Sequence, residues 1–399
     1  MASHLPDRLP GPEGPVTGEP RPLRGISVVV PTLGHPESVR RLLESLRTAA
    51  GLLPEGHDAE VIVVDDSSDQ DLRGIRQACA ETGASYVRGP RRVGAKRNLG
   101  AARAKHPLVL FIDSDCVATP SLLLEHLRAH NEEQAPSGRP VAAVAGPTVV
   151  EGVDEAAAWR TVKDSVVVNA PWNWPQHYRE LWWAATSNLS VRTEALDDIG
   201  GFDELTYTVV GGEDVDLGVR LHEAGWATVG HPSAVVRHAT DGIDRLGQFR
   251  RKLFLYGRAC VYNCVRQPQF ARWWPNPVTA AALGAGAAVL LPGRSRTAAL
   301  ATTAAGTAAW YAADTRRTAR RSGAGWRSAA AATSVDWSYH LGIVREALRR
   351  GRPLLAAKRF DYFRADRFAP APPASTTPSA PSAADAPAPA GPAEERKTV

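Results

Sequence analysis

The sequence predicts an α/β protein whose central sheet is mostly parallel and flanked by helices. Over residues 26–115, near-continuous apolar strands alternate with segments of helical spacing. Such strands are typical of a parallel sheet that is covered on both faces. The chain has 399 residues, of which 44% are hydrophobic and 22% charged, the balance of a globular protein. We find no internal repeat.

The expected elements alternate strictly along this region. Strands are expected at 26–32, 59–68, 85–89 and 107–115, and helices at 36–50, 72–83 and 94–105. The carboxyl ends of parallel strands meet at one edge of a sheet, where ligands of such folds bind. We therefore expect three polar strand ends to lie together there, namely Pro31-Thr32, Asp65-Asp66 and Asp113-Ser114-Asp115.

The third strand end places two carboxylates one residue apart. Asp113 and Asp115 repel each other unless a cation or hydrogen-bond donors compensate their charges. Mn²⁺ and Mg²⁺ suit this position, because they are held by few protein carboxylates while phosphate oxygens and water complete the shell. The pattern alone is also typical of an ordinary Asp-rich turn.

Two further motifs carry charge at helix starts. The stretch RRVGAKRNLGAAR (91–103) places basic residues at a helix start, where free backbone N–H groups favour an anion. The same pattern is also typical of an ordinary basic helix that faces solvent. In GGEDVDLGVRLHEAGW (211–226), two glycines precede Glu213 and Asp214 at the start of an amphipathic helix. These acids either stabilise the helix start or present a general base.

Taken in order, seven elements resemble family-2 glycosyltransferases of the GT-A fold. The elements are VVVPT, VIVVDDSS, GAKRNLGAA, DSDC, TSNLSVR with GGFDE, GGEDVDLGVRL and PSAVVRH. The resemblance covers roughly residues 26–260. It implies transfer of a sugar from a nucleotide-sugar donor to an acceptor hydroxyl, with Mn²⁺ or Mg²⁺ and with inversion of the anomeric centre.

The resemblance also implies roles for individual residues. Asp214 matches the catalytic base, with Glu213 beside it, and Asp113, Asp115 and His238 match the metal side. The residues that match nucleotide-sugar contacts are Pro31, Thr32, Asp65, Asp66, Lys96, Arg97, Asn98 and Asp113. Those on the acceptor side are Trp182, Trp183 and Asn188.

The aromatic stretch 170–192 allows more than one interpretation. Its tryptophans suit an acceptor wall, because aromatic faces stack on sugar rings, but core packing or a membrane-facing edge fits equally well. We leave these alternatives open at the level of sequence.

We expect four segments: disordered residues 1–24, a glycosyltransferase domain over 25–260, a helical region over 261–365 and a disordered Pro/Ala-rich tail over 366–399. In the helical region, 278–291 and 297–313 are short and weakly apolar for membrane spans, so a membrane hairpin and helices packed on the domain both remain possible. The region faintly resembles the C-terminal part of actinobacterial transferases that glycosylate redox cofactors or natural products, but no peptide-binding module precedes the domain.

Composition narrows the function classes. The net charge of +5 permits an acidic ligand or membrane surface without demanding one, and we expect no nucleic-acid partner. Four irregularly spaced cysteines favour free thiols in a reducing cytosol over a disulfide framework or a metal pair at Cys260 and Cys264. No apolar leader is evident, so the prediction is a cytoplasmic protein, with a possible place on the cytoplasmic face of the membrane.

Two rival functions remain. A sugar nucleotidyltransferase would carry a Gly-rich basic loop after the first strand, whereas PTLGHPES has one glycine and no Lys or Arg. An idle nucleotide-binding scaffold on the same fold would have no need of the repelling carboxylates in DSD and GGED. The lack of G-x-G-x-x-G after the first strand argues against a dehydrogenase.

Overall fold

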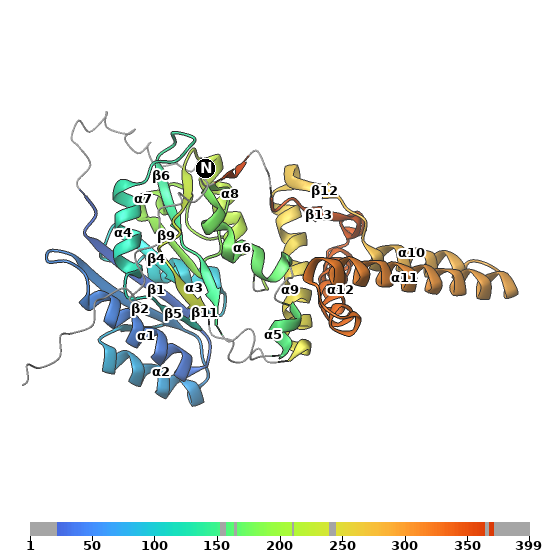
Figure 1. Cartoon of the computed structure of the whole chain (residues 1–399), viewed down its shortest axis with the longest axis horizontal. Coiled ribbons are helices and arrows are strands. Elements are labelled where there is room, and N and C mark those ends of the chain that lie inside the picture. The colour runs from blue at the N-terminus through green and yellow to red at the C-terminus, as the bar shows by residue number, and fades with distance from the viewer. Residues whose placement is uncertain are drawn as a thin grey trace, which may run out of the picture.

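A computed structural model describes residues 22–151, 157–162, 166–209, 211–238, 245–363 and 367–370. Nearly all of the two segments expected to be disordered, 1–24 and 366–399, lies outside these residues. The described chain forms an α/β body that carries the large sheet and, beside it, a helical part that ends in a projecting pair of helices (Figure 1). The predicted α/β class is therefore confirmed.

The large sheet has the strand order β14-β8-β10-β6-β9-β4-β1-β2-β3. Its strands are β1 (Gly25–Thr32), β2 (Asp58–Asp65), β3 (Ser85–Arg88), β4 (Leu108–Ile112), β6 (Val141–Ala145), β8 (Tyr178–Leu181), β9 (Asn188–Arg192), β10 (Ala227–Gly230) and β14 (Ala369–Pro370). From β3 to β4 every pairing is parallel, as predicted. The other half is mixed, because β8 and β9 run against their neighbours.

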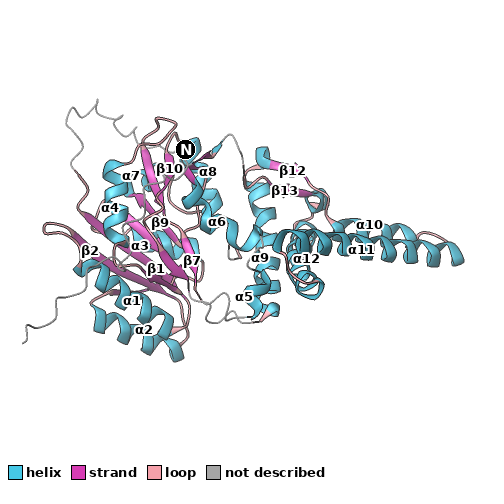
Figure 2. Cartoon of the chain, in the orientation of Figure 1, coloured by secondary structure: helices cyan, strands magenta, loops and turns pink. Residues whose placement is uncertain are grey.

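Helices cover the sheet on both faces (Figure 2). Along the described residues the helices are α1 (Pro36–Gly51), α2 (Asp69–Thr82), α3 (Val93–Ala101), α4 (Leu122–Glu132), α5 (Ala157–Val162), α6 (Val166–His177), α7 (Thr193–Asp198), α8 (Glu213–Glu223), α9 (Leu246–Arg266), α10 (Pro277–Val289), α11 (Gly293–Ser322) and α12 (Trp326–Arg349), of which α10 to α12 lie away from the sheet. The helices expected near 36–50, 72–83 and 94–105 are thus present with shifted ends.

Strand β1 explains why the first strands are apolar throughout. Alternate side chains of a strand point to opposite faces. Val28 and Val30 enter a core that includes residues of α1 and α2, whereas Val29 enters the opposite core with residues of α8 and α9. Both faces of the strand are therefore buried, so the successive side chains Val28, Val29 and Val30 are all apolar.

A second, three-stranded sheet has the order β5-β11-β7 and consists of β5 (Cys116–Ala118), β7 (Thr148–Val150) and β11 (Val236–His238). In its antiparallel pairing of β11 with β5, His238 lies opposite Cys116. Because Cys116 directly follows Asp115, this register brings His238 close to Asp115 although the two residues are far apart in the chain.

Helices α9 and α12 join the helical part to the α/β body by close packing. A Cβ atom added to Gly257 would lie 2.0 Å from the carbonyl oxygen of Tyr339, and one added to Gly342 would lie 2.1 Å from that of Phe254. Only glycine permits backbones this close. The fully buried Glu346 carboxylate accepts a 2.8 Å hydrogen bond from Arg258 across the same contact.

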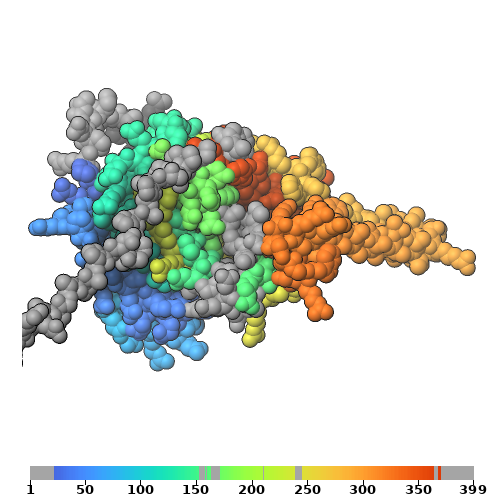
Figure 3. All heavy atoms as spheres, viewed as in Figure 1, coloured from blue at the N-terminus to red at the C-terminus, as the bar shows by residue number. Residues whose placement is uncertain are grey.

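Four short elements complete this part: the 3₁₀ helices η1 (Pro268–Phe270) and η2 (Pro353–Ala357), and the strands β12 (Ala271–Trp273) and β13 (Lys358–Phe360), which pair in a two-stranded sheet. Helices α10 and α11 run side by side in opposite directions (Figure 1), and Figure 3 shows them as an arm that extends from the rest of the molecule. Near the end of this pair Leu290 is 86% exposed. Among the described residues, no helix combines the length and the apolar character that a membrane crossing requires.

Candidate functional site

The first two strand ends are joined by a buried lysine. The Lys96 ammonium donates a 2.6 Å hydrogen bond to the carbonyl oxygen of Thr32 and forms an ion pair with Asp66. Lys96 comes from α3, which approaches β1 closely because Gly100 faces Val29, where a Cβ would lie 2.3 Å away. Lys96 thus ties three of the predicted nucleotide-side residues to one another.

Asp65, at the end of β2, is engaged inside the protein. Its carboxylate accepts hydrogen bonds from the Ser67 backbone N–H at 2.8 Å and from the Tyr86 hydroxyl at 3.0 Å. The Ser67 hydroxyl in turn accepts from the Gly34 backbone N–H at 2.5 Å. Asp65 therefore shapes the loops that follow β1 and β2, and its contact with a nucleoside stays a prediction.

Arg97 lies at the centre of an acidic cluster. Its guanidinium donates to Glu213 at 2.7 Å and to Asp113 at 3.2 Å, and the Arg97 and Glu213 side chains are only 4% and 5% exposed. Burial acts to lower the pKa of Arg97, but the charges of Glu213 and Asp113 outweigh it and raise that pKa. One buried cation thus connects the DSD motif to the GGED motif.

The neighbouring carboxylate, Asp115, faces His238. The two side chains approach to 3.2 Å between Oδ2 and Nε2, and the carboxylate is 41% exposed. Burial acts to raise the pKa of Asp115, but the hydrogen bond with His238 and the nearby charge of Lys252 together outweigh burial and lower that pKa. An anionic carboxylate beside an imidazole is a donor pair that fits Mn²⁺, with phosphate oxygens and water left to complete the shell. Among the described residues, no three or more His, Cys, Asp or Glu side chains lie close enough together to hold a metal ion by themselves.

Sequence reasoning missed Lys252, which α9 brings to this edge. Its ammonium lies 5.3 Å from the centre of the Trp172 ring, and that ring stacks on His238 at 4.9 Å. Burial acts to lower its pKa, but Tyr256 and the carboxylates of Asp115 and Asp113 outweigh burial and raise it. Nothing near Lys252 in the sequence marks it, because the side chains around it, apart from Tyr256, come from three other segments: α6, β11 and the turn after β4.

The two glycines before α8 have a steric role. Gly211 and Gly212 have φ values of 101° and 93°, in the left-handed region that favours glycine. An added Cβ would lie 2.9 Å from the Tyr256 ring at Gly211 and 3.0 Å from the Tyr207 ring at Gly212. The chain therefore turns tightly here and delivers Asp214 into the site.

Asp214 has the electrostatics of a general base. Burial, with the nearby charge of Glu213, raises its pKa to about 7. Arg97 and the backbone N–H of Val215, which donates to the Asp214 carboxylate at 2.8 Å, offset part of this effect. A carboxylate with such a pKa can both take up and release a proton near neutral pH.

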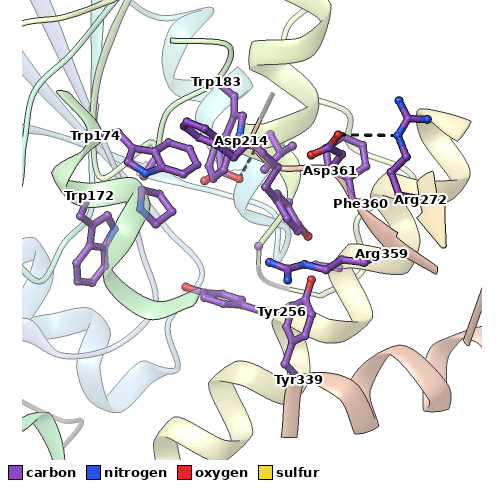
Figure 4. Close-up of a pocket in the computed structure, with 18 of the residues that line it drawn as sticks. Trp172, Trp174, Trp183, Asp214, Tyr256, Arg272, Tyr339, Arg359, Phe360 and Asp361 are labelled. Atoms are coloured by element: carbon purple, nitrogen blue, oxygen red, sulfur yellow. Dashed lines mark hydrogen bonds and ion pairs between the residues drawn. The ribbon is translucent and has the colours of Figure 1, made fainter. Parts of the chain in front are cut away.

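Asp214 lies on the wall of a cavity of about 410 Å³ that also contacts the C-terminal part of the chain (Figure 4). The labelled side chains in this view come from α6, from the segment between β8 and β9, from α8, α9 and α12, and from the β12–β13 hairpin with the residue that follows it. The side chains are chiefly aromatic, and include Trp172, Trp174, Trp183, Tyr256, Trp274, Tyr339, Phe360, Tyr362 and Phe363.

The predicted acceptor-side residues occupy different places. Trp183 lines the cavity and donates from its indole nitrogen to the Tyr362 carbonyl oxygen at 2.8 Å. Trp182 points instead into the core against Phe270 and Phe360. The aromatic stretch therefore supplies both core packing and part of a cavity wall, and binding of an acceptor at this wall stays a prediction.

Two predicted contact residues hold the fold together. Asn188 is 1% exposed, and its amide bonds to His126 at 2.8 Å and to the Ala234 carbonyl oxygen at 2.7 Å. The Asn98 amide accepts from the Phe202 N–H at 2.8 Å and donates to the Phe202 carbonyl oxygen at 2.9 Å. Neither residue lines the cavity, and direct ligand contact by either stays a prediction.

Comparisons with known proteins point to one family. The family described as Glycosyl transferase family 2 matches residues 27–177, and Glycosyl transferase family group 2 matches residues 108–313, more than half of the chain. A pre-mycofactocin glycosyltransferase from Mycobacterium tuberculosis is 31% identical over 251 residues, covering 61% of this chain and 48% of that protein. A validoxylamine A glucosyltransferase from Streptomyces hygroscopicus is 30% identical over 225 residues, covering 50% and 52%.

Among solved structures, a mannosyltransferase from Pyrobaculum calidifontis in complex with GDP-Man and Mn²⁺ aligns with a TM-score of 0.49 at 18% identity, covering 81% of this chain and 87% of that one. The chain spans about half the length of the curated relatives it matches. The match over more than half of the residues, together with the order of the seven motifs, leads to one conclusion: the chain belongs to glycosyl transferase family 2.

Proposed function

We propose that this protein is a metal-dependent, inverting glycosyltransferase that moves a sugar from a nucleotide-sugar donor to an acceptor hydroxyl. The observation that carries the proposal is the position of Asp214. It opens onto the aromatic cavity on one side and lies, on the other, beside the Arg97 cluster that holds Asp113. This arrangement offers a proton acceptor between a place for an acceptor molecule and a place for a donor diphosphate.

The proposed reaction is a single displacement. The acceptor oxygen attacks the anomeric carbon, and the bond from that carbon to the diphosphate oxygen breaks. The electron pair leaves with the nucleoside diphosphate, and the hydroxyl proton moves to Asp214. Attack opposite the leaving group inverts the anomeric centre. The pKa of about 7 supports this role, because the carboxylate is then ionised in a large fraction of molecules at neutral pH.

The leaving group gains negative charge as its bond breaks, and positive groups aimed at that charge speed the reaction. Asp115 and His238 would hold Mn²⁺ or Mg²⁺, which supplies part of this positive charge when bound. Lys252, whose pKa is raised by Tyr256 and the two DSD carboxylates despite burial, supplies another part. Lys96 orders the strand ends at which a nucleoside would bind.

The names of the relatives support a hexosyl donor, since one is a glucosyltransferase. The donor base is addressed by calorimetric titration with UDP, GDP and dTDP, each with and without Mn²⁺. We expect one nucleotide to bind in a Mn²⁺-dependent manner, and Asp115→Ala to abolish that dependence. Asp197→Ala, on the exposed surface of α7, is the matched control and should bind as the wild type does. If no nucleotide binds to the folded wild type in the presence of Mn²⁺, the donor site is wrongly assigned.

Turnover is tested with the corresponding nucleotide sugar, by measuring release of nucleoside diphosphate. Asp214→Asn should bind the nucleotide normally but lose about 10²–10⁴-fold in rate, as expected for removal of a general base. Equal rates in the two proteins would rule out Asp214 as the base. Release of pyrophosphate from a nucleoside triphosphate and a sugar phosphate would instead identify a sugar nucleotidyltransferase, and nucleotide binding with no turnover of any donor would favour the scaffold.

A further inference from the structure

Building on the proposed function, we infer that the acceptor is a small amphipathic molecule rather than a carbohydrate. It has an aromatic or other apolar body, a hydroxyl that reaches Asp214, and an anionic group that Arg359 binds. The inference concerns the aromatic cavity, and it assigns a binding role to Arg359 of β13, which lies outside the seven motifs.

The polar chemistry of the cavity wall is sparse. Among the described residues that line it, no side chain is Ser, Thr, Asn, Gln, Glu, His or Lys. The polar side chains are two arginines, two aspartates, three tyrosines and the indole groups of the tryptophans. A carbohydrate acceptor would bring many hydroxyls into this space, and each hydroxyl without a partner costs about 1–3 kcal/mol. An apolar body avoids that cost and suits the aromatic faces.

The charges on the wall are unevenly matched. Arg272 and Asp361 lie opposite each other at 3.9 Å across the β12–β13 hairpin. Within the described part of the chain, Arg359 has no carboxylate within ion-pair distance. Its guanidinium lies over Trp274 at 4.9 Å and near Tyr339 at 5.8 Å instead. A cation that lies beside two aromatic rings and has no carboxylate within ion-pair distance is a group that an anionic ligand would pair with, and guanidinium binds carboxylate through two parallel hydrogen bonds.

The two charged groups share one cavity. Asp214 and Arg359 line the same cavity, and Figure 4 shows the Arg359 side chain extending past Tyr339 toward the side where Tyr256 lies. The volume of about 410 Å³ is within the usual range for a small organic ligand. The hydroxyl end would meet Asp214, the body would lie among the tryptophans, and the anionic end would meet Arg359.

The test compares an anionic aromatic probe with its neutral ester and with a sugar. Binding of para-hydroxyphenylpropionate, of its neutral methyl ester and of maltose is measured by quenching of tryptophan fluorescence and by calorimetry, with the protein saturated with its nucleotide and Mn²⁺. We expect the acid to bind more tightly than the ester by about tenfold or more, and maltose not to bind. Arg359→Met should weaken binding of the acid by about tenfold and change the affinity for the ester by no more than about twofold.

Two further variants keep the test sharp. Arg359→Lys retains the charge without the planar fork, so it should fall between the wild type and Arg359→Met. Arg272 lies in the same wall but already faces the Asp361 carboxylate. Arg272→Met should therefore change binding of the acid and of the ester by the same factor, or leave both unchanged. The inference is overturned if the acid does not bind, if Arg359→Met affects acid and ester alike, or if maltose binds more tightly than the acid. Because nucleotide binding is recorded in the same samples, failure of the donor site would appear separately.

Discussion

The sheet edge and the aromatic cavity meet at Asp214, but they are built by different means. At the sheet edge, buried charges hold one another: Lys96 pairs with Asp66, and Arg97 with Glu213 and Asp113. In the cavity, aromatic rings from several separate segments form the wall. Ion pairs fix a geometry that a diphosphate and a metal require, whereas rings define only a shape and an apolar environment. Under the proposed function, the sheet edge would serve the transfer reaction and the cavity would select the acceptor.

The strongest test of this comparison removes the cation at the sheet edge. Arg97→Met would leave Glu213 buried without its partner and Asp113 without its guanidinium. We expect the free energy of unfolding to fall by about 3–5 kcal/mol, the usual cost of breaking a buried ion pair from one side. Urea denaturation monitored by circular dichroism measures it.

The control is a substitution in the cavity. Arg359→Met removes a cation that has no carboxylate partner among the described residues, so we expect a change below about 1 kcal/mol. Similar losses in the two variants would contradict the view that charges organise one side and rings the other. The comparison would also fail if Arg97→Met were as stable as the wild type.

A second test uses pH, and its expected effect is about tenfold in rate per pH unit. Burial beside Glu213 raises the pKa of Asp214 to about 7, and only the ionised carboxylate accepts a proton. The turnover rate at saturating substrate should therefore fall about tenfold per unit as the pH decreases below that value. The residual rate of Asp214→Asn should lack this limb. A flat profile in the wild type would show that Asp214 does not limit the reaction.

The same raised pKa affects stability with a definite sign. Between the ordinary pKa of a carboxyl group, 3.8, and about 7, the folded protein keeps a proton on Asp214 that the unfolded chain has lost. The free energy of unfolding should therefore decrease as the pH rises through this window and then level off. Asp214→Asn removes this dependence, so above about pH 7 we expect it to be more stable than the wild type.

The smallest expected effect concerns Lys252, which lies between the two regions. Lys252→Met should weaken binding of the nucleoside diphosphate by about three- to tenfold, because one positive charge near the DSD carboxylates is lost. Lys105→Met is the matched control, since its ammonium is on the surface beside Glu60 at 3.4 Å. If Lys252→Met changed only acceptor binding, this residue would belong to the cavity rather than to the sheet edge.

Much of the sheet edge could be predicted from the sequence. Apolar runs and turn residues are local signals, and they located the strands that end at Thr32, Asp65 and Ile112. Once those strands are parallel, their ends must meet at one edge, so neighbouring charges follow from topology alone. The turn and the helix start at the Gly-Gly-Glu-Asp motif could likewise be predicted, because both depend on adjacent residues.

The tertiary structure alone decided the remaining features. Trp182 and Trp183 are neighbours with the same side chain, yet one packs in the core and the other lines the cavity. Asn188 was expected near the acceptor, but its amide bonds to His126 and to the backbone inside the sheet. The second sheet set the register that brings His238 to Asp115. The cavity is formed by segments that are far apart in the chain. A local sequence pattern does not determine which distant segments pack together, so the cavity could not be predicted from the sequence.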